Sequence, residues 1–489
     1  MKTKQNMLVR GVTQKKGIFA IAVAVVGGLM LSRLTVISPL LGVIALACGV
    51  VLALALLIRN VYSLIYGWFV LTGFLFVILY RLLPSEFYPF VGRGIFWGVL
   101  LCIIGAWALD NVLSKRRFLR FDDLGIKVTL ILFLAWCLLS LFGSLDVVNS
   151  VKQISHIAIG LMASYMFFDL FSRDDKNLRQ TVGIIFIVVM AISGIVVLAA
   201  VQSVVLGLPV YKRISLWFWN TNSLGLLLFM SIPILLTGGL PLLPNKGMRA
   251  VAVIFMLLAL FLSFSRASWL AGLVSISFLL WRSRIKTSMQ AAIVMGLLAA
   301  ALAVPIVGAD VYDFFAGEQY TGRREIWQGA WFAACERPVF GTGIGNWLQV
   351  APHYIQTPWL KQVGTHSVYL QNAAEIGFPS VALMLVFFAC FFYASLKIEQ
   401  QLRTPYLVSV TRGATATLLG ILVHGIFENG FLLTAFSAAE FTVILPYIFI
   451  AIPFSAQKLE EKGRSEGQAS YQSAQNRTRQ FLRHPQQSG

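Results

Sequence analysis

Long apolar runs, separated from one another by short polar or basic segments, cover most of the chain. A helix that crosses the hydrocarbon core of a bilayer, about 30 Å thick, needs roughly 20 apolar residues. The runs therefore predict transmembrane helices near 18–36, 39–58, 61–80, 94–113, 124–142, 152–171, 181–206, 222–240, 250–263, 267–281, 289–308, 376–396, 406–427 and 431–453. We predict an all-α fold, a polytopic transmembrane bundle of about 12–14 helices.

The composition supports this class and excludes others. Hydrophobic residues make up 58% of the sequence and charged residues 12%, whereas a soluble domain carries about 25% charged residues. The net charge of +19 could indicate nucleic-acid binding, but the basic residues stand in short clusters between apolar runs and not on a soluble module. We expect no nucleic-acid partner and interpret these clusters as topology signals.

The basic clusters predict the orientation, because Lys and Arg concentrate in cytoplasmic loops. With the N-terminus inside, most of the clusters fall on the cytoplasmic side. No small-residue cleavage site follows the first apolar run, so we expect the first helix to be retained. Residues 454–489 lack apolar periodicity and predict a disordered basic cytoplasmic tail. Both termini are thus expected in the cytoplasm.

This orientation leaves one long external loop, at about 309–365, and long loops are usually functional. It contains "TGRREIWQGAWFAACERPVFGTGIGNW", whose apolar positions at i, i+3, i+4 and i+7 predict an interfacial helix with Trp327, Ala330, Trp331 and Ala334 on one face. Pro338 and the glycines from Gly341 should end this helix. The glycine run lacks the context of a phosphate-binding P-loop, and we interpret it as a plain turn.

Three basic positions on the external side are candidates for chemistry. Arg266, in "LFLSFSRASWLAG", lies between two short apolar runs and should sit at the outer interface, where it marks an anion site or else snorkels to lipid phosphate. Arg323 and Arg324 begin the interfacial helix and can bind phosphate in bidentate fashion. His366 directly precedes a predicted span; histidine is suited to accept a hydroxyl proton, although a lone histidine is more often structural.

Other polar residues could support this site. Tyr369 would share the helix face of His366, and Gln371 would pair with Glu375 at i, i+4. His424 and Glu428, in "VHGIFENG", have the same spacing near the outer end of a late span. They could line an acceptor cavity or satisfy each other, and we favour the structural role.

Neither metal nor cofactor is predicted. Four of the five cysteines fall inside apolar runs, and no clustered Cys or His spacing is typical of a metal site. Asp310 and Asp313 do not form the acidic motif of metal-dependent oligosaccharyltransferases. We therefore expect chemistry that uses amino-acid side chains alone.

Three of these segments follow one another in the chain: "SFSRASWLAG", "GRREIWQGAWFAACERPVFGTGIGNW" and "THSVYLQNAAEIGFPSVALMLVFF". Together they closely resemble the O-antigen ligase and polymerase superfamily of bacterial membrane glycosyltransferases, as does the Asn-rich "WFWNTNSLGLLLFMSIPILL" upstream. The resemblance covers roughly residues 215–450. It divides the chain into N-terminal transmembrane helices at 1–214, a catalytic membrane region at 215–453 and the tail.

The resemblance implies transfer of a glycan from undecaprenyl diphosphate to an acceptor hydroxyl on the periplasmic face of the bacterial inner membrane. It assigns diphosphate binding to Arg266 and Arg323, with Arg324 as a helper, and the role of general base or acceptor-orienting group to His366. A single displacement would invert the anomeric carbon. The acceptor or support residues would come from Tyr369, Glu375, His424 and Glu428.

The acceptor stays open at this stage. Lipid A core oligosaccharide is our first expectation, and the alternatives are a lipid-linked chain, as in a polymerase, or a protein hydroxyl, as in an O-oligosaccharyltransferase. A flippase or transporter ranks below these, because it predicts midplane charges and internal repeats that the sequence does not show. No residue visibly discriminates among these acceptors. Sugar composition and oligomeric state are likewise open.

Overall fold

The computed structural model describes residues 88–116, 119, 122–207, 221–239, 243, 245–282, 319–429 and 440–483. Within these ranges there are thirteen α-helices and no strand, which confirms the predicted all-α fold. The predicted spans at 18–36, 39–58, 61–80 and 289–308 lie outside the described residues, as do Asp310 and Asp313. The other ten predicted spans each coincide with a helix over the residues that the structure describes, which for the span 431–453 begin at Glu440.

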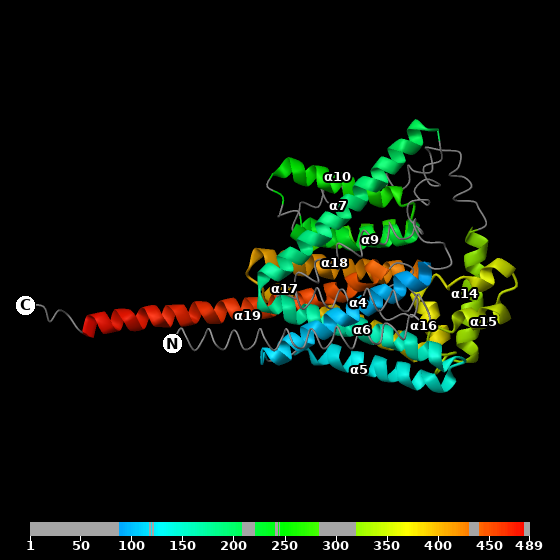
Figure 1. Cartoon of the computed structure of the whole chain (residues 1–489), viewed down its shortest axis with the longest axis horizontal. Helices are drawn as coiled ribbons and strands as arrows, with labels where there is room; N and C mark the ends of the chain where they lie inside the picture. Colours follow the sequence, from blue (N-terminus) through cyan, green and yellow to red (C-terminus); the bar gives the residue numbers. More distant parts are fainter. Residues whose placement is uncertain are drawn as a thin grey trace, which may run out of the picture.

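Ten helices form a bundle whose members run roughly alongside one another (Figure 1). They are α4 (Tyr88–Leu113), α5 (Leu124–Leu139), α6 (Val147–Arg173), α7 (Asp175–Val205), α9 (Thr221–Ile234), α10 (Lys246–Leu262), α11 (Arg266–Arg282), α17 (Phe378–Gln401), α18 (Pro405–Phe427) and α19 (Glu440–Arg483). Short turns extend α5 as η1 (Ser140–Gly143) and α9 as η2 (Leu235–Gly239). Aspartate or asparagine caps begin several of them; Asp123, for example, accepts from the Ile126 N–H at 2.9 Å.

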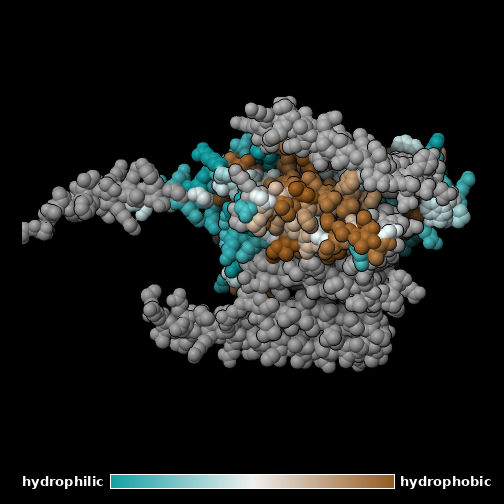
Figure 2. All heavy atoms as spheres, turned by 90° about the horizontal axis from the view of Figure 1, so that it is seen from above, coloured by the Kyte–Doolittle hydropathy of each residue, from teal (hydrophilic) through white to brown (hydrophobic). Residues whose placement is uncertain are grey.

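The bundle is built for a bilayer. Among the described residues, seven helices are long and apolar enough to cross a membrane. Apolar side chains gather over the middle of the described surface and polar side chains lie toward its two ends (Figure 2). Leu124, Ile187 and Leu198 are each more than 60% exposed on this surface, which is unfavourable in water and favourable against lipid tails. The chain is a multi-pass membrane protein.

A second group of helices lies across one end of the bundle (Figure 1). It consists of α14 (Gln319–Glu336), α15 (Trp347–Tyr354), η5 (Pro358–Gln362) and α16 (Val368–Ile376), and we call it the cap. The cap has a small apolar core of its own, formed by residues such as Ile326, Ala330, Trp347, Leu360 and Ala374. The long loop thus contains helices, as the sequence predicted.

The face that α14 buries within the protein includes only part of the predicted apolar face, namely Ala330 and Ala334. Ile326, Ala330, Ala333 and Ala334 are buried, whereas Trp331 is 50% exposed. The reason is that α14 packs against α16, and small alanine side chains permit this close approach. Trp331 is left on another face of the helix.

The glycine run is a turn that docks on α16. The N–H groups of Thr342 and Gly343 donate to the carbonyl oxygens of Ala374 and Glu375, and those of Gly345 and Trp347 donate to the Glu375 carboxylate at 2.9 and 3.1 Å. Since these N–H groups already have partners, the run is not a preformed phosphate cradle, in agreement with its interpretation as a turn.

We expect Gly377→Ala to destabilise the cap by about 2–4 kcal/mol. Gly377 joins α16 to α17 with φ +84°, and an added Cβ would lie 2.0 Å from the Val339 carbonyl oxygen. The measurement is the thermal unfolding midpoint of purified protein in detergent. Gly105→Ala is the matched control, because its Cβ meets nothing within 4 Å. Equal losses of Tm in both variants would contradict this reading.

The predicted disorder after residue 454 needs correction, because α19 continues as a helix to Arg483 and projects from the bundle (Figure 1). The first turns of this extension are anchored. Ser455 Oγ donates to the Phe168 carbonyl at 3.2 Å, and Lys458 Nζ contacts Asp122 at 2.7 Å. The apolar periodicity of the sequence cannot predict such contacts between distant segments.

Candidate active site

The turn between α10 and α11 places Arg266 at the cap end of the bundle. Phe264 adopts φ +54° in this turn, and α11 begins at Arg266 as the pattern of two short apolar runs predicted. Hydrogen bonds of Ser268 hold the first turn of α11 in place: its Oγ lies 2.9 Å from Ser265 Oγ and 3.2 Å from His424 Nε2 on α18. A hydrogen-bonded helix start gives the Arg266 side chain a defined origin.

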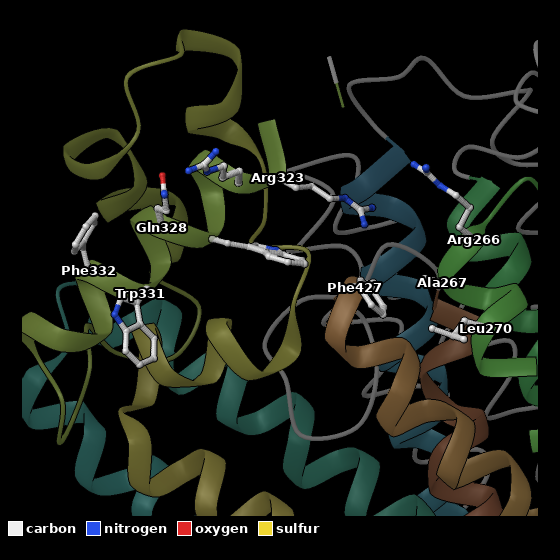
Figure 3. A pocket seen from close by; sticks show the side chains of 10 residues that line it. Arg266, Ala267, Leu270, Arg323, Gln328, Trp331, Phe332 and Phe427 are labelled. Carbon is white, nitrogen blue, oxygen red and sulfur yellow. The ribbon is translucent and has the colours of Figure 1, made fainter. Parts of the chain in front are cut away.

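Arg266 and Arg323 meet at one cavity although they come from different parts of the fold. The cavity has a volume of about 740 Å³ and is lined by Arg266, Ala267, Leu270, Arg323, Arg324, Trp327, Gln328, Trp331, Phe332 and Phe427. Figure 3 shows Arg266 on α11 and Arg323 on α14 extending into the space beside Phe427. Three guanidinium groups around one cavity form a site suited to an anion with several oxygens.

His366 lies just before α16 in a backbone conformation that is uncommon for its type. Its φ is +49°, and a non-glycine residue in this region costs on the order of 1–3 kcal/mol. The preceding residue is held from two sides: Trp327 Nε1 donates to the Thr365 carbonyl at 3.0 Å, and Thr365 Oγ1 donates to Asn429 Oδ1 at 3.1 Å. These bonds fix where the imidazole begins.

Glu428 connects His366 to Arg323. Its carboxylate lies 2.8 Å from His366 Nδ1 and accepts from Arg323 Nη2 at 3.4 Å and from Asn222 Nδ2 at 2.9 Å. Burial alone would raise the pKa of Glu428, but His366, Arg323 and His424 together lower it below its usual value. An ionised Glu428 must accept from Nδ1, which makes Nε2 the ring atom that can take a proton.

The side chains of His424 and Glu428 bond other partners, not each other as their i, i+4 spacing suggested. Glu428 follows the end of α18 with φ −151° and ψ 152°, and its backbone N–H donates to the His424 carbonyl at 3.0 Å. His424 is fully buried, stacks on Phe229 at 4.9 Å and contacts Ser268. Its role is in the packing of α18, whereas Glu428 belongs to the site.

Tyr369 and Glu375 do not line the cavity. Tyr369 donates its hydroxyl to the Leu422 carbonyl at 2.8 Å, and burial raises the pKa of Tyr369 to about 12. Gln371 donates to Glu375 at 3.2 Å, as the spacing predicted. Burial raises the pKa of Glu375 to about 7, against the lowering effect of its hydrogen bonds from Gly345, Trp347 and Gln371. Both residues hold α16 in place.

The sequence missed two asparagines of this site. Asn222, at the start of α9, binds Glu428, and Asn429 binds Thr365 beside the histidine. The available signal was the polar interruption at each end of an apolar run, "NTNS" and "FENG". Among the described residues, no group of three or more His, Cys, Asp or Glu side chains could hold a metal ion.

Part of this region is similar to a known protein family. Residues 251–385 match the family described as O-antigen ligase, and the match includes Arg266, Arg323, Arg324 and His366. It confirms the resemblance read from the sequence motifs. No curated protein matches the chain.

Proposed function

Because residues 251–385 match the O-antigen ligase family, we propose that this protein transfers a glycan from a lipid diphosphate to an acceptor hydroxyl. One observation carries the proposal: Arg266 and Arg323 share a cavity, and Arg323 and His366 share Glu428. Fixed positive charge for a leaving group therefore lies next to an oriented base.

The arginines suit a diphosphate leaving group. Charge develops on the bridging oxygen as the anomeric C–O bond breaks, and guanidinium groups held in advance stabilise that charge without reorganisation. Arg266 and Arg323 would provide this contact, with Arg324 as a helper at the edge of the cavity. A cavity at the end of a transmembrane bundle also suits a donor with an isoprenoid anchor, such as undecaprenyl diphosphate.

His366 is suited to activate the acceptor. Its Nε2 would take the proton of the acceptor hydroxyl while the acceptor oxygen bonds to the anomeric carbon and the diphosphate leaves with the electron pair. Glu428 would stabilise the imidazolium that forms. General-base catalysis of this kind contributes about 10²–10⁴-fold. A single displacement inverts the anomeric carbon, and NMR assignment of the product linkage checks this.

The location that we propose is the bacterial inner membrane, with the cap on the periplasmic face and both termini in the cytoplasm. The support is the charge distribution: Arg173, Lys458, Lys462 and Arg464 gather where α6 ends and α19 projects, at the end opposite the cap (Figure 1). Basic residues concentrate on the cytoplasmic side.

Lipid A core oligosaccharide is the acceptor that we propose, and incubation of the purified protein in lipid tests it. Undecaprenyl-diphosphate-linked oligosaccharide and lipid A core would be supplied, with products resolved by gel and mass spectrometry. We expect transfer of intact glycan to the core by the wild type and by the surface controls His353→Ala and Arg337→Ala. His366→Ala and Arg266→Ala should lose it.

Other products would change the proposal in defined ways. A ladder of longer lipid-linked chains without modified core would indicate a polymerase, and glycan on an added protein acceptor would indicate an O-oligosaccharyltransferase. No transfer to any acceptor by folded protein would contradict the glycosyltransferase and favour transport of the lipid-linked glycan.

A further inference from the structure

The cavity has two ends of different character, and Arg323 lies between them. One end is lined by Ala267 and Leu270 of α11 and by Phe427 of α18, which are residues of bundle helices. The other end is lined by Gln328, Trp331 and Phe332 of α14, a cap helix. Figure 3 shows Arg323 between these two groups of side chains.

The α14 end combines exposed aromatic area with an uncommitted amide. Trp331 is 50% exposed and Phe332 58% exposed, and Trp331 packs edge-on against Phe378 with ring centroids 5.6 Å apart. Gln328 is exposed and makes no hydrogen bond to any residue that the structure describes. A pyranose ring presents an apolar C–H face and a rim of hydroxyls, and aromatic rings beside an amide complement both.

The order of isoprenoid, diphosphate and sugar along the donor matches the order of the side chains along the cavity. A lipid-linked glycan is linear, with its diphosphate between the isoprenoid and the first sugar. If the arginines hold the diphosphate, then the isoprenoid and the glycan must leave in different directions. The bundle end of the cavity is nearer the membrane-spanning helices and suits the isoprenoid. The glycan is therefore expected at the α14 end.

The length of this end also fits. Phe332 lies eight residues beyond Arg324 in α14, which corresponds to about 12 Å at 1.5 Å per residue and accommodates roughly two sugar rings. An isoprenoid at this position would cover the Gln328 amide with hydrocarbon, and an unpaired buried amide is costly.

We propose that Gln328, Trp331 and Phe332 form a subsite for the first sugars of the lipid-linked donor. This inference rests on the proposed function, since it takes the arginines as the diphosphate site. The subsite makes the protein selective for the donor glycan in addition to its lipid diphosphate.

Equilibrium binding to the full-length protein in lipid nanodiscs tests this assignment without requiring turnover. The probes are polyprenyl diphosphates that carry no sugar, one sugar or three sugars on the same lipid chain. We expect the wild type to bind the three-sugar probe on the order of 10-fold more tightly than the sugar-free probe. Gln328→Ala and Phe332→Ala should reduce this gain to about 2-fold or less and leave the sugar-free affinity unchanged.

Trp359→Ala is the matched control, because Trp359 is an aromatic residue of the cap that is 57% exposed and does not line the cavity. It should keep the full gain. A wild type without any gain from sugars would overturn the subsite. So would weaker binding of the sugar-free probe by Phe332→Ala, since that places the lipid at this end.

Failure of the subsite and failure of the proposed function are distinguishable. If transfer is observed and depends on His366 but the sugar-length gain is absent, the subsite is wrong and the function stands. If sugars improve binding through Phe332 but no acceptor is glycosylated, the subsite stands and the proposed reaction is wrong.

Discussion

Glu428→Gln is expected to slow glycan transfer by about 100-fold or more, with little change in the KM for the donor. Glutamine keeps the size of the side chain but removes the charge that orients His366 at Nδ1 and stabilises its protonated form. The loss should therefore appear in kcat. Steady-state kinetics with a lipid-linked donor measures it.

The pH dependence of the Tm distinguishes the effect of the Glu428 charge from the effect of the size and shape of its side chain. The pKa of Glu428 is lowered in the folded protein from its usual 4.5. The stability that its ionisation contributes is therefore complete above about pH 4.5 and is lost as pH falls through the lowered value. We expect a lower Tm for Glu428→Gln than for the wild type at pH 7, and a difference that shrinks below pH 4.5.

Glu336→Gln provides the control, because Glu336 is an exposed carboxylate of the cap that bonds Tyr354 outside the cavity. It should retain wild-type kcat. A Glu428→Gln variant with unchanged kcat would remove the carboxylate from the mechanism and would leave His366 oriented by its backbone alone.

Arg266→Ala is expected to lower kcat/KM by about 10²–10³-fold, the usual effect of removing one fixed donor to developing charge. Arg266→Lys should recover only a small part of this, since an ammonium group cannot make the bidentate contact of a guanidinium. The side chain is partly exposed at the start of α11, so neither change should alter the fold. Kinetics and the affinity for sugar-free polyprenyl diphosphate are the two measurements.

The affinity measurement identifies the role of Arg266. Weaker binding of polyprenyl diphosphate in Arg266→Ala, with normal binding in the surface control Arg337→Ala, places the guanidinium at the diphosphate. Unchanged affinity together with unchanged kcat/KM would mean that Arg266 interacts with membrane lipid phosphate instead, the alternative that its interfacial position allows.

The sequence determined the features that depend on neighbours along the chain. The ten predicted spans in the described ranges, the start of α11 at Arg266 and the pairing of Gln371 with Glu375 all follow from apolar length or from the helical repeat. The order of the motifs was sufficient to indicate the family that residues 251–385 match. These properties are local, because they depend only on residues that are close together in the sequence.

Only the tertiary structure decided which distant groups meet. The partner of His366 is Glu428, 62 residues away, whereas the i, i+4 spacing in the sequence could only suggest His424 as the partner of Glu428. Likewise α16 selects the buried face of α14 and occupies the glycine turn, and the bundle anchors the start of the tail helix. A periodic pattern shows which side of a helix is apolar, but hydrogen-bond partners depend on where the chain returns in space.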